Sequence, residues 1–238
     1  MPESPFRFKQ FNIAQSKSAM KVGTDGVLLG AWVRIPDEVD SVLDIGTGTG
    51  LIALQIAQRS DSEIIDALEI ESGAFEQAVE NFENSPWSDR LFCYHASLQE
   101  FAMEMDEGYD LIVCNPPFFN NSYQAKGEKR NLARQTEQLD FETLLKCTSR
   151  LLNPEGTCAF IIPMDQEEIF TAAGKKNSLY PNRITRVKGS PSSPVKRSLI
   201  QFQREKASPY LSELVVETSR HVYTQEYVDL VKDFYLKM

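Results

Sequence analysis

From residue 41 onward, short apolar runs alternate with segments of helical periodicity, and this alternation is the strongest constraint on the fold. Short apolar runs bounded by glycine or charge are typical of buried strands, whereas apolar residues that recur every three or four positions indicate helices. Strands are expected over 41–45, 64–69, 91–95, 109–114, 157–163, 182–189 and 198–204. Helices are expected over 51–59, 74–82, 98–103, 139–152 and 166–176. We therefore predict an α/β fold with a mostly parallel seven-stranded sheet and helices on both faces. Its last strand should be antiparallel, because SPSSPVK replaces a connecting helix.

The two ends of the chain depart from this alternation. The stretch FRFKQFNIAQ is typical of an extended hairpin. Residues 24–33 are typical of a short helix capped by Thr24 or Asp25. Residues 224–236 predict an amphipathic helix capped by Thr224. We predict one domain over 1–238, composed of an N-terminal extension (1–40), a core (41–206) and a C-terminal strand and helix addition (207–238).

Composition narrows the class of protein. Hydrophobic residues make up 42% of the chain and charged residues 25%, which is ordinary for a globular protein. No apolar run approaches the roughly 18 residues of a membrane span, and the N-terminus lacks the apolar segment of a secretory signal. The four cysteines form no CxxC pair and only two histidines occur, which argues against a zinc site. We expect a cytoplasmic protein with reduced cysteines, no metal and no membrane contact, and we favour a monomer.

Charge is segregated along the chain, although the net charge of −9 argues at first against a nucleic-acid partner. Residues 61–110 hold 14 Asp and Glu against one Arg, whereas residues 175–206 hold nine Lys and Arg against one Glu. Segregation of this kind can build a basic face on an acidic protein. Ordinary solvated surface charge would give the same pattern, and the charges alone leave both interpretations open.

The motif DIGTGTG (44–50) follows the first core strand and opens the next helix. Glycines in such a turn let the backbone approach a ligand, and the helix N-terminus offers free N–H groups. The spacing G-x-G-x-G differs from the G-x-G-x-x-G of dinucleotide dehydrogenases. Glu69 ends the second strand, where an acid can accept both ribose hydroxyls of a nucleoside ligand. The alternative for Glu69 is a solvated carboxylate at a strand end.

The stretch VCNPPFF (113–119) ends the fourth strand and places hydrogen-bond acceptors beside aromatic side chains. Asn115 has a side-chain carbonyl at the edge where open α/β sheets bind ligands. The prolines fix the loop and bring no N–H groups that would compete for the acceptors. Phe118 and Phe119 offer flat faces on which an extruded base can stack. This combination suits the exocyclic amine of a purine; the alternative is a Pro-rich turn with two core phenylalanines.

Together with DIGTGTG and Glu69, the NPPF stretch resembles the class I S-adenosylmethionine-dependent methyltransferases, which have a Rossmann-like fold. More narrowly, the chain resembles the bacterial valine-tRNA (adenine-N(6))-methyltransferase family from Phe6 to Tyr235. The stretches that carry this resemblance are FKQFNIAQ, KVGTDGVLLGAW, LIALQIAQR, NSPW, NPPFF and PVKRSLIQF. The resemblance implies S-adenosylmethionine as cofactor and tRNA as partner. The implied reaction methylates the N(6) amine of the adenine just 3′ of the anticodon.

The resemblance also implies roles for individual residues. The methionine portion of the cofactor would be held by Asp44, Gly46, Gly48 and Gly50, and its ribose by Glu69. The segment that would close over the cofactor contains Lys21, Thr24 and Asp25. Asn115 and Pro116 would accept hydrogen bonds from the target amine, with Phe118 stacked on the ring.

Two positions depart from the pattern of related enzymes. Ser97 follows the third strand, where relatives often place an Asp against the cofactor's adenine, and Glu71 replaces an Asp. Both changes affect cofactor contacts rather than the reaction. RNA binding we assign to a basic face beside the NPPF loop, formed by Lys126, Arg130, Arg134, Arg183, Arg186 and Arg197.

Other functions stay open on these motifs. The same acceptors could serve guanine N(2) of ribosomal RNA or a glutamine side chain of a protein, since some guanine enzymes carry NPPF and glutamine enzymes usually carry NPPY. A non-catalytic RNA-binding protein is a third possibility. The presence of both Asn115 and Glu69 argues against it, because a protein without catalysis needs neither.

Overall fold

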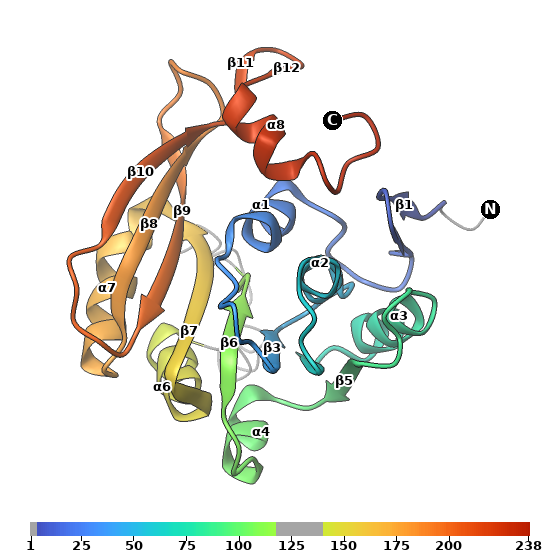
Figure 1. The fold of residues 1–238 in the computed structure, drawn as a ribbon, viewed down its shortest axis with the longest axis vertical. Helices are drawn as coiled ribbons and strands as arrows, with labels where there is room; N and C mark the ends of the chain where they lie inside the picture. Colours follow the sequence, from blue (N-terminus) through green and yellow to red (C-terminus); the bar gives the residue numbers. More distant parts are fainter. Residues whose placement is uncertain (1–3, 118–139) are drawn as a thin grey trace, which may run out of the picture.

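The computed structural model describes residues 4–117 and 140–238, and an eight-stranded sheet forms its centre (Figure 1). The strands are β3 (Ser41–Ile45), β4 (Ile64–Glu69), β5 (Leu91–His95), β6 (Tyr109–Cys114), β7 (Leu152–Pro163), β8 (Tyr180–Lys188), β9 (Val195–Gln203) and β10 (Tyr210–Val215). The first four have the bounds expected from their apolar runs. β7 begins at Leu152 rather than at residue 157, so it follows its helix without a loop.

The strand order across the sheet is β10-β8-β9-β7-β6-β3-β4-β5. β3 to β7 are parallel to their neighbours in this group, whereas β9 is antiparallel to both β7 and β8. The predicted antiparallel pairing of the last two core strands is therefore confirmed. The central sheet has one strand more than the seven predicted, because β10 from the C-terminal addition pairs parallel with β8. β10 lies at the edge of the sheet and exposes Tyr210 and Leu211, and Ser212 and Glu213 interrupt the apolar run of its sequence.

Helices cover both faces of the sheet, as predicted (Figure 1). One face carries α1 (Thr24–Trp32), α2 (Leu51–Arg59), α3 (Ser72–Glu83) and α8 (Gln225–Val231). The other carries α4 (Leu98–Glu104), α6 (Phe141–Leu151) and α7 (Glu167–Lys176), with a 3-10 turn, η1 (Met164–Gln166), leading into α7. Each helical layer closes its own apolar core against the sheet. Among the described residues, none of the helices is long and apolar enough to cross a membrane.

The N-terminal extension packs against the C-terminal addition. β1 (Phe6–Arg7) and β2 (Asn12–Ile13) form the expected hairpin. Phe8 forms an isolated bridge with Tyr235, and Nζ of Lys9 donates to the carbonyl oxygen of Met238 at 2.9 Å. A second small hairpin, β11 (Glu217–Ser219) with β12 (Val222–Tyr223), precedes α8.

The predicted helix caps are confirmed at one end of the chain and wrong at the other. Thr224 caps α8, since its Oγ1 accepts from the N–H of Tyr227 at 3.2 Å. α1 instead has Gly23 at its cap position, without a side-chain hydrogen bond. Asp25 lies within the first turn of α1, where a carboxylate interacts favourably with the helix dipole.

Candidate functional site

A cleft opens along the carboxyl ends of β3, β4 and β6, the edge at which open α/β sheets bind ligands. It has two lobes, of about 330 Å³ and about 290 Å³, whose walls share Met20, Gly46, Gly48 and Asn115. The first lobe lies between the start of α1 and the glycine turn. The second lies between that turn and the residues after β4 and β5. The fold therefore brings the glycine motif, Glu69 and the described part of the NPPF stretch to one place.

The glycine turn after β3 borders both lobes. Gly46, Gly48 and Gly50 all have left-handed backbone, with φ of 68°, 59° and 83°, which an L side chain would strain. Apart from the neighbouring residues in the chain, a Cβ at Gly46 or Gly48 would meet no atom of the described residues within 4 Å, which leaves space for a ligand. A Cβ at Gly50 would lie 2.5 Å from the ring of Phe82. Gly50 therefore serves the packing of α3 against the turn.

Asp44, which begins the motif, is completely buried beneath the turn. Its Oδ2 accepts from the Thr47 hydroxyl at 2.6 Å and from the Ala53 N–H at 3.2 Å, which ties the turn to α2. Burial raises the pKa of Asp44 to about 7, against the effect of these hydrogen bonds, and the nearby charge of Glu69 adds to the rise. Asp44 shapes the turn in this structure, and its contact with a cofactor stays a prediction.

Glu69 ends β4 and borders the second lobe. Its Oε2 accepts the N–H of Gly48 at 2.8 Å, and its Oε1 accepts the N–H groups of Ile70 and Glu71 at 3.0 and 2.9 Å. A carboxylate oxygen has two lone pairs, so Oε2 keeps capacity for a ligand hydroxyl. The position fits the predicted ribose role, which stays a prediction.

The far wall of the second lobe is built where α3 and α4 begin. Oγ of Ser97 accepts from the Glu100 N–H at 3.2 Å and forms a capping box with that residue. Glu71 caps α3 by accepting from the N–H groups of Gly73 and Ala74, and these bonds lower the pKa of Glu71. The two residues that depart from the resembling enzymes therefore both serve helix caps at the cleft wall.

The first lobe has Lys21, Thr24 and Asp25 in its wall, together with residues of the glycine turn. Their closure over a cofactor stays a prediction. Nε of Arg197 donates to Oδ2 of Asp25 at 2.8 Å. This ion pair fixes the first turn of α1 to β9. Arg197, which we predicted to bind RNA, is thus in direct contact with Asp25, which we predicted to bind the cofactor.

Asn115 follows β6 and borders both lobes. Its Oδ1 atom is buried and accepts no hydrogen bond from the part of the chain that the structure describes. Burial of an amide oxygen without a partner is unfavourable, so an acceptor left open where the lobes meet points to a ligand N–H group. Pro116 is buried beside it, and the predicted stacking residue, Phe118, lies outside the described residues.

The three described residues among those predicted to bind RNA, Arg183, Arg186 and Arg197, do not lie on one face of the sheet. Cζ of Arg183 lies 4.2 Å from the centre of the Trp32 ring, and Nη1 donates to the Trp32 carbonyl at 3.0 Å. Burial lowers the pKa of Arg183 to about 10. Arg186 points to the other face of the sheet, where its Nη2 lies 2.7 Å from Oε1 of Glu167 in α7. Arg197 contacts the opposite end of α1 from Arg183. The remaining three, Lys126, Arg130 and Arg134, lie outside the described residues.

Sequence reasoning missed part of the cleft wall. Ser18, Ala19 and Met20, from the segment before α1, border the second lobe. Ile70 borders it too and is 59% exposed. An apolar residue directly after a strand-end acid was the available signal for Ile70, whereas the segment before α1 carries no local pattern that predicts its place.

Known proteins are similar to this chain in sequence and in fold. The methyltransferase small domain family matches residues 16–161. A tRNA1(Val) (adenine(37)-N6)-methyltransferase from Flavobacterium psychrophilum is 56% identical over 98% of this chain and 100% of its own length. Another, from Christiangramia forsetii, is 54% identical over 100% of both chains. The solved structure of a predicted O-methyltransferase from Agrobacterium tumefaciens has a TM-score of 0.69 at 21% identity and covers 88% of this chain and 96% of its own. That likeness supports the fold alone.

Proposed function

This chain belongs to the tRNA1(Val) (adenine(37)-N6)-methyltransferase family, and we propose on that basis that it methylates the N6 amine of adenine 37 in a valine tRNA. The structural observation that supports the proposal is that Oδ1 of Asn115 accepts no hydrogen bond from the described residues. This buried Oδ1 stands where the two lobes of the cleft meet. An amine held there would be next to a ligand on the glycine turn.

The cleft fits S-adenosylmethionine, which supplies an activated methyl group on its sulfonium. Gly46 and Gly48 leave room for close backbone contact, since a Cβ at either position would enter open space. Glu69 offers a carboxylate oxygen to the ribose hydroxyls in the second lobe, and Ile70 an exposed apolar face to the adenine. Thr24 and Asp25 border the other lobe, where they would enclose the methionine portion.

Asn115 and Pro116 would orient the target amine. The lone pair of an adenine amine is delocalised into the ring, so the amine is a poor nucleophile. Oδ1 of Asn115 and the Pro116 carbonyl would accept its two N–H groups, direct the lone pair toward the methyl donor and stabilise the positive charge that develops. No strong general base is needed, because the proton becomes acidic once the nitrogen is alkylated and can pass to water.

The four free cysteines favour a reducing compartment for this reaction, and we place it in the cytoplasm. Burial raises the thiol pKa of all four, Cys93, Cys114, Cys147 and Cys158, so they stay protonated and unreactive.

Transfer of labelled methyl from S-adenosylmethionine to unmodified tRNA tests the proposal. Nucleoside mass analysis should detect N6-methyladenosine in a valine-tRNA transcript. A transcript with guanine in place of adenine 37 is the matched control and should stay unlabelled. Label in N2-methylguanosine, in ribosomal RNA or in protein glutamine, with none in tRNA adenine, would overturn it.

A further inference from the structure

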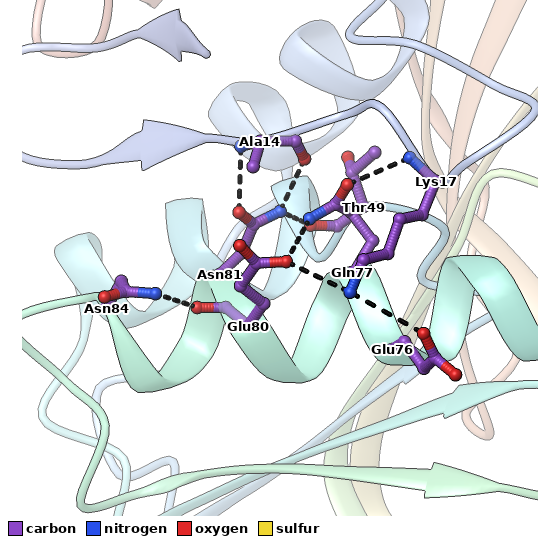
Figure 2. Close-up of polar contacts among 8 residues, drawn as sticks. All are labelled: Ala14, Lys17, Thr49, Glu76, Gln77, Glu80, Asn81 and Asn84. Carbon is purple, nitrogen blue, oxygen red and sulfur yellow. Dashed lines mark hydrogen bonds and ion pairs between the residues drawn. The ribbon is translucent and has the colours of Figure 1, made fainter. Parts of the chain in front are cut away.

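The segment before α1, residues 14–20, is a wall of the cofactor cleft that depends on α3 for its position. Ser18, Ala19 and Met20 border the second lobe, and Met20 borders both. The segment has no secondary structure of its own after β2. Its polar contacts with α3 are shown in Figure 2. Side chains of α3 therefore decide where this wall lies.

Asn81 joins the segment to the glycine turn. Its Oδ1 accepts the Ala14 N–H at 2.8 Å, and its Nδ2 donates to the carbonyl oxygens of Ala14 at 2.9 Å and of Thr49 at 2.8 Å (Figure 2). Thr49 belongs to the glycine turn and borders the first lobe. Asn81 is only 4% exposed, and both protons of its amide are used. One buried side chain thus fixes the position of the segment 14–20 relative to the glycine turn.

Two further features fit the segment to α3. Gln77, one turn before Asn81 and fully buried, accepts the N–H of Lys17 with its Oε1 at 3.1 Å. Nζ of Lys17 also lies 3.4 Å from Oε2 of Glu80. At Gly73 a Cβ would come within 2.8 Å of the Lys17 carbonyl oxygen, so the absence of a side chain lets the segment lie against the helix.

We propose that Asn81, supported by Gln77 and Gly73, is a positioning residue for cofactor binding, which couples the segment 14–20 to the glycine turn. The inference rests on the proposed function only in taking S-adenosylmethionine as the ligand of the cleft. A cofactor between the two walls would bind to a preformed site, so less ordering would oppose binding. Asn81 itself touches the walls and not the reacting atoms.

Calorimetry with S-adenosylmethionine on the full chain measures the effect of Asn81→Ala. We expect its Kd, and the KM for the cofactor, to rise about tenfold, as for the loss of buried hydrogen bonds. kcat should change by less than about twofold. A merely structural role would lower the melting temperature and the active fraction without changing KM. Asn84→Ala is the matched control, because Asn84 is the C-cap residue of the same helix and, among the described residues, its Nδ2 bonds only the Glu80 carbonyl, at 2.7 Å.

Gly73→Ala keeps the test decisive if Asn81→Ala folds poorly. Alanine is the better helix former, which offsets part of the cost of displacing the Lys17 carbonyl, so this variant should still fold. Its Cβ should nevertheless push the Lys17 carbonyl away and weaken cofactor binding. Hydrogen exchange at Ala14 and Lys17, whose amides donate to Asn81 and Gln77, should be slowed by cofactor in the wild type and become fast in both variants.

Wild-type affinity in both Asn81→Ala and Gly73→Ala would overturn the inference, even with faster exchange in the segment. Wild-type protein that binds S-adenosylmethionine but leaves tRNA unmethylated would overturn the proposed function and not this inference. If the wild type fails to bind S-adenosylmethionine, both are overturned.

Discussion

Oε2 of Glu69 accepts a hydrogen bond from the N–H of Gly48 at 2.8 Å, so the acid at the end of β4 also holds the turn after β3. Removal of this carboxylate should loosen the turn and delete the proposed ribose contact. We expect Glu69→Ala to weaken S-adenosylmethionine binding by ~1.5–3 kcal/mol, the range for hydrogen bonds to a charged group. Calorimetry on the folded variant measures the change. Glu69→Gln, which retains one carbonyl acceptor, should lose less, and unchanged affinity in Glu69→Ala would contradict the ribose role.

Asn115→Ala should strongly slow methyl transfer and leave cofactor binding almost unchanged. The variant removes the open acceptor between the lobes, which should cost ~3–4 kcal/mol in the transition state, or a rate loss of about 100- to 1,000-fold. Cofactor affinity should change far less, because the glycine turn and Glu69 are untouched. Single-turnover methylation beside cofactor calorimetry separates the two effects. Nearly full activity in Asn115→Ala would remove the central observation behind the proposed function.

Phe118→Ala should weaken binding of the target base rather than slow the chemical step. Our prediction, which rests on the sequence, is a loss of ~1–3 kcal/mol for one missing base stack. The loss should appear when the tRNA concentration is varied in single-turnover assays and disappear near saturation. A variant that loses rate at saturating tRNA would place Phe118 in the chemical step.

Asp44 should make stability fall as pH rises. Its pKa is about 7 in the folded protein and ~3.9 in an unfolded chain. Between these values the folded state binds a proton that the unfolded state has released. The free energy of unfolding should therefore decrease through this window, by up to ~1.4 kcal/mol per pH unit, with the loss complete above about pH 7. Asp44→Asn, which is neutral throughout, should flatten this slope in denaturant unfolding. Equal slopes in both proteins would refute the assignment.

Arg183 should contribute to the stability of the fold and not to RNA binding. Its guanidinium stacks on Trp32 and bonds the carbonyl of that residue, so Arg183→Ala should lower the free energy of unfolding by ~1–2 kcal/mol. The salt dependence of tRNA binding should be unaltered. Thermal melts and filter binding at several salt concentrations give the two readouts. A flattened salt dependence in Arg183→Ala would restore it to the RNA-binding face.

Lys126, Arg130 and Arg134 should, in contrast to Arg183, contribute to RNA binding and not to the stability of the fold. Replacing all three by alanine should weaken tRNA binding and flatten its salt dependence, because fewer counterions are released. The fold should melt as the wild type does. Unchanged binding at every salt concentration would identify these charges as ordinary solvated surface.

The parts of the fold that were predictable are those that local patterns encode. β3 and β4 have the predicted bounds, Ser41–Ile45 and Ile64–Glu69, because buried parallel strands are short apolar runs. The three stretches of the site come together because strands of one direction end at one edge of a sheet. Asn115 and Glu69 could therefore be placed beside the glycine turn before any coordinates were known.

Contacts between distant segments were not predictable in this way. Gln77 and Asn81 are polar residues, which hydropathy alone assigns to solvent, yet both are buried on the inner face of α3 and bond the segment 14–20. The opposite faces of Arg183 and Arg186 follow from strand alternation, since they are three positions apart. Their partners, Trp32 and Glu167, could not be read from any local pattern.

The position of α1 also bears on the order in which the growing chain can build its cleft. Nε1 of Trp32 donates to Oγ1 of Thr185, 153 residues further along, at 2.8 Å, and Asp25 is held by Arg197. During synthesis from the N-terminus, the glycine turn, Glu69 and Asn115 are therefore all complete before Thr185 and Arg197, these two late partners of α1, exist. A nascent chain that stops ahead of β8 should bind S-adenosylmethionine poorly, although it already contains every cofactor motif.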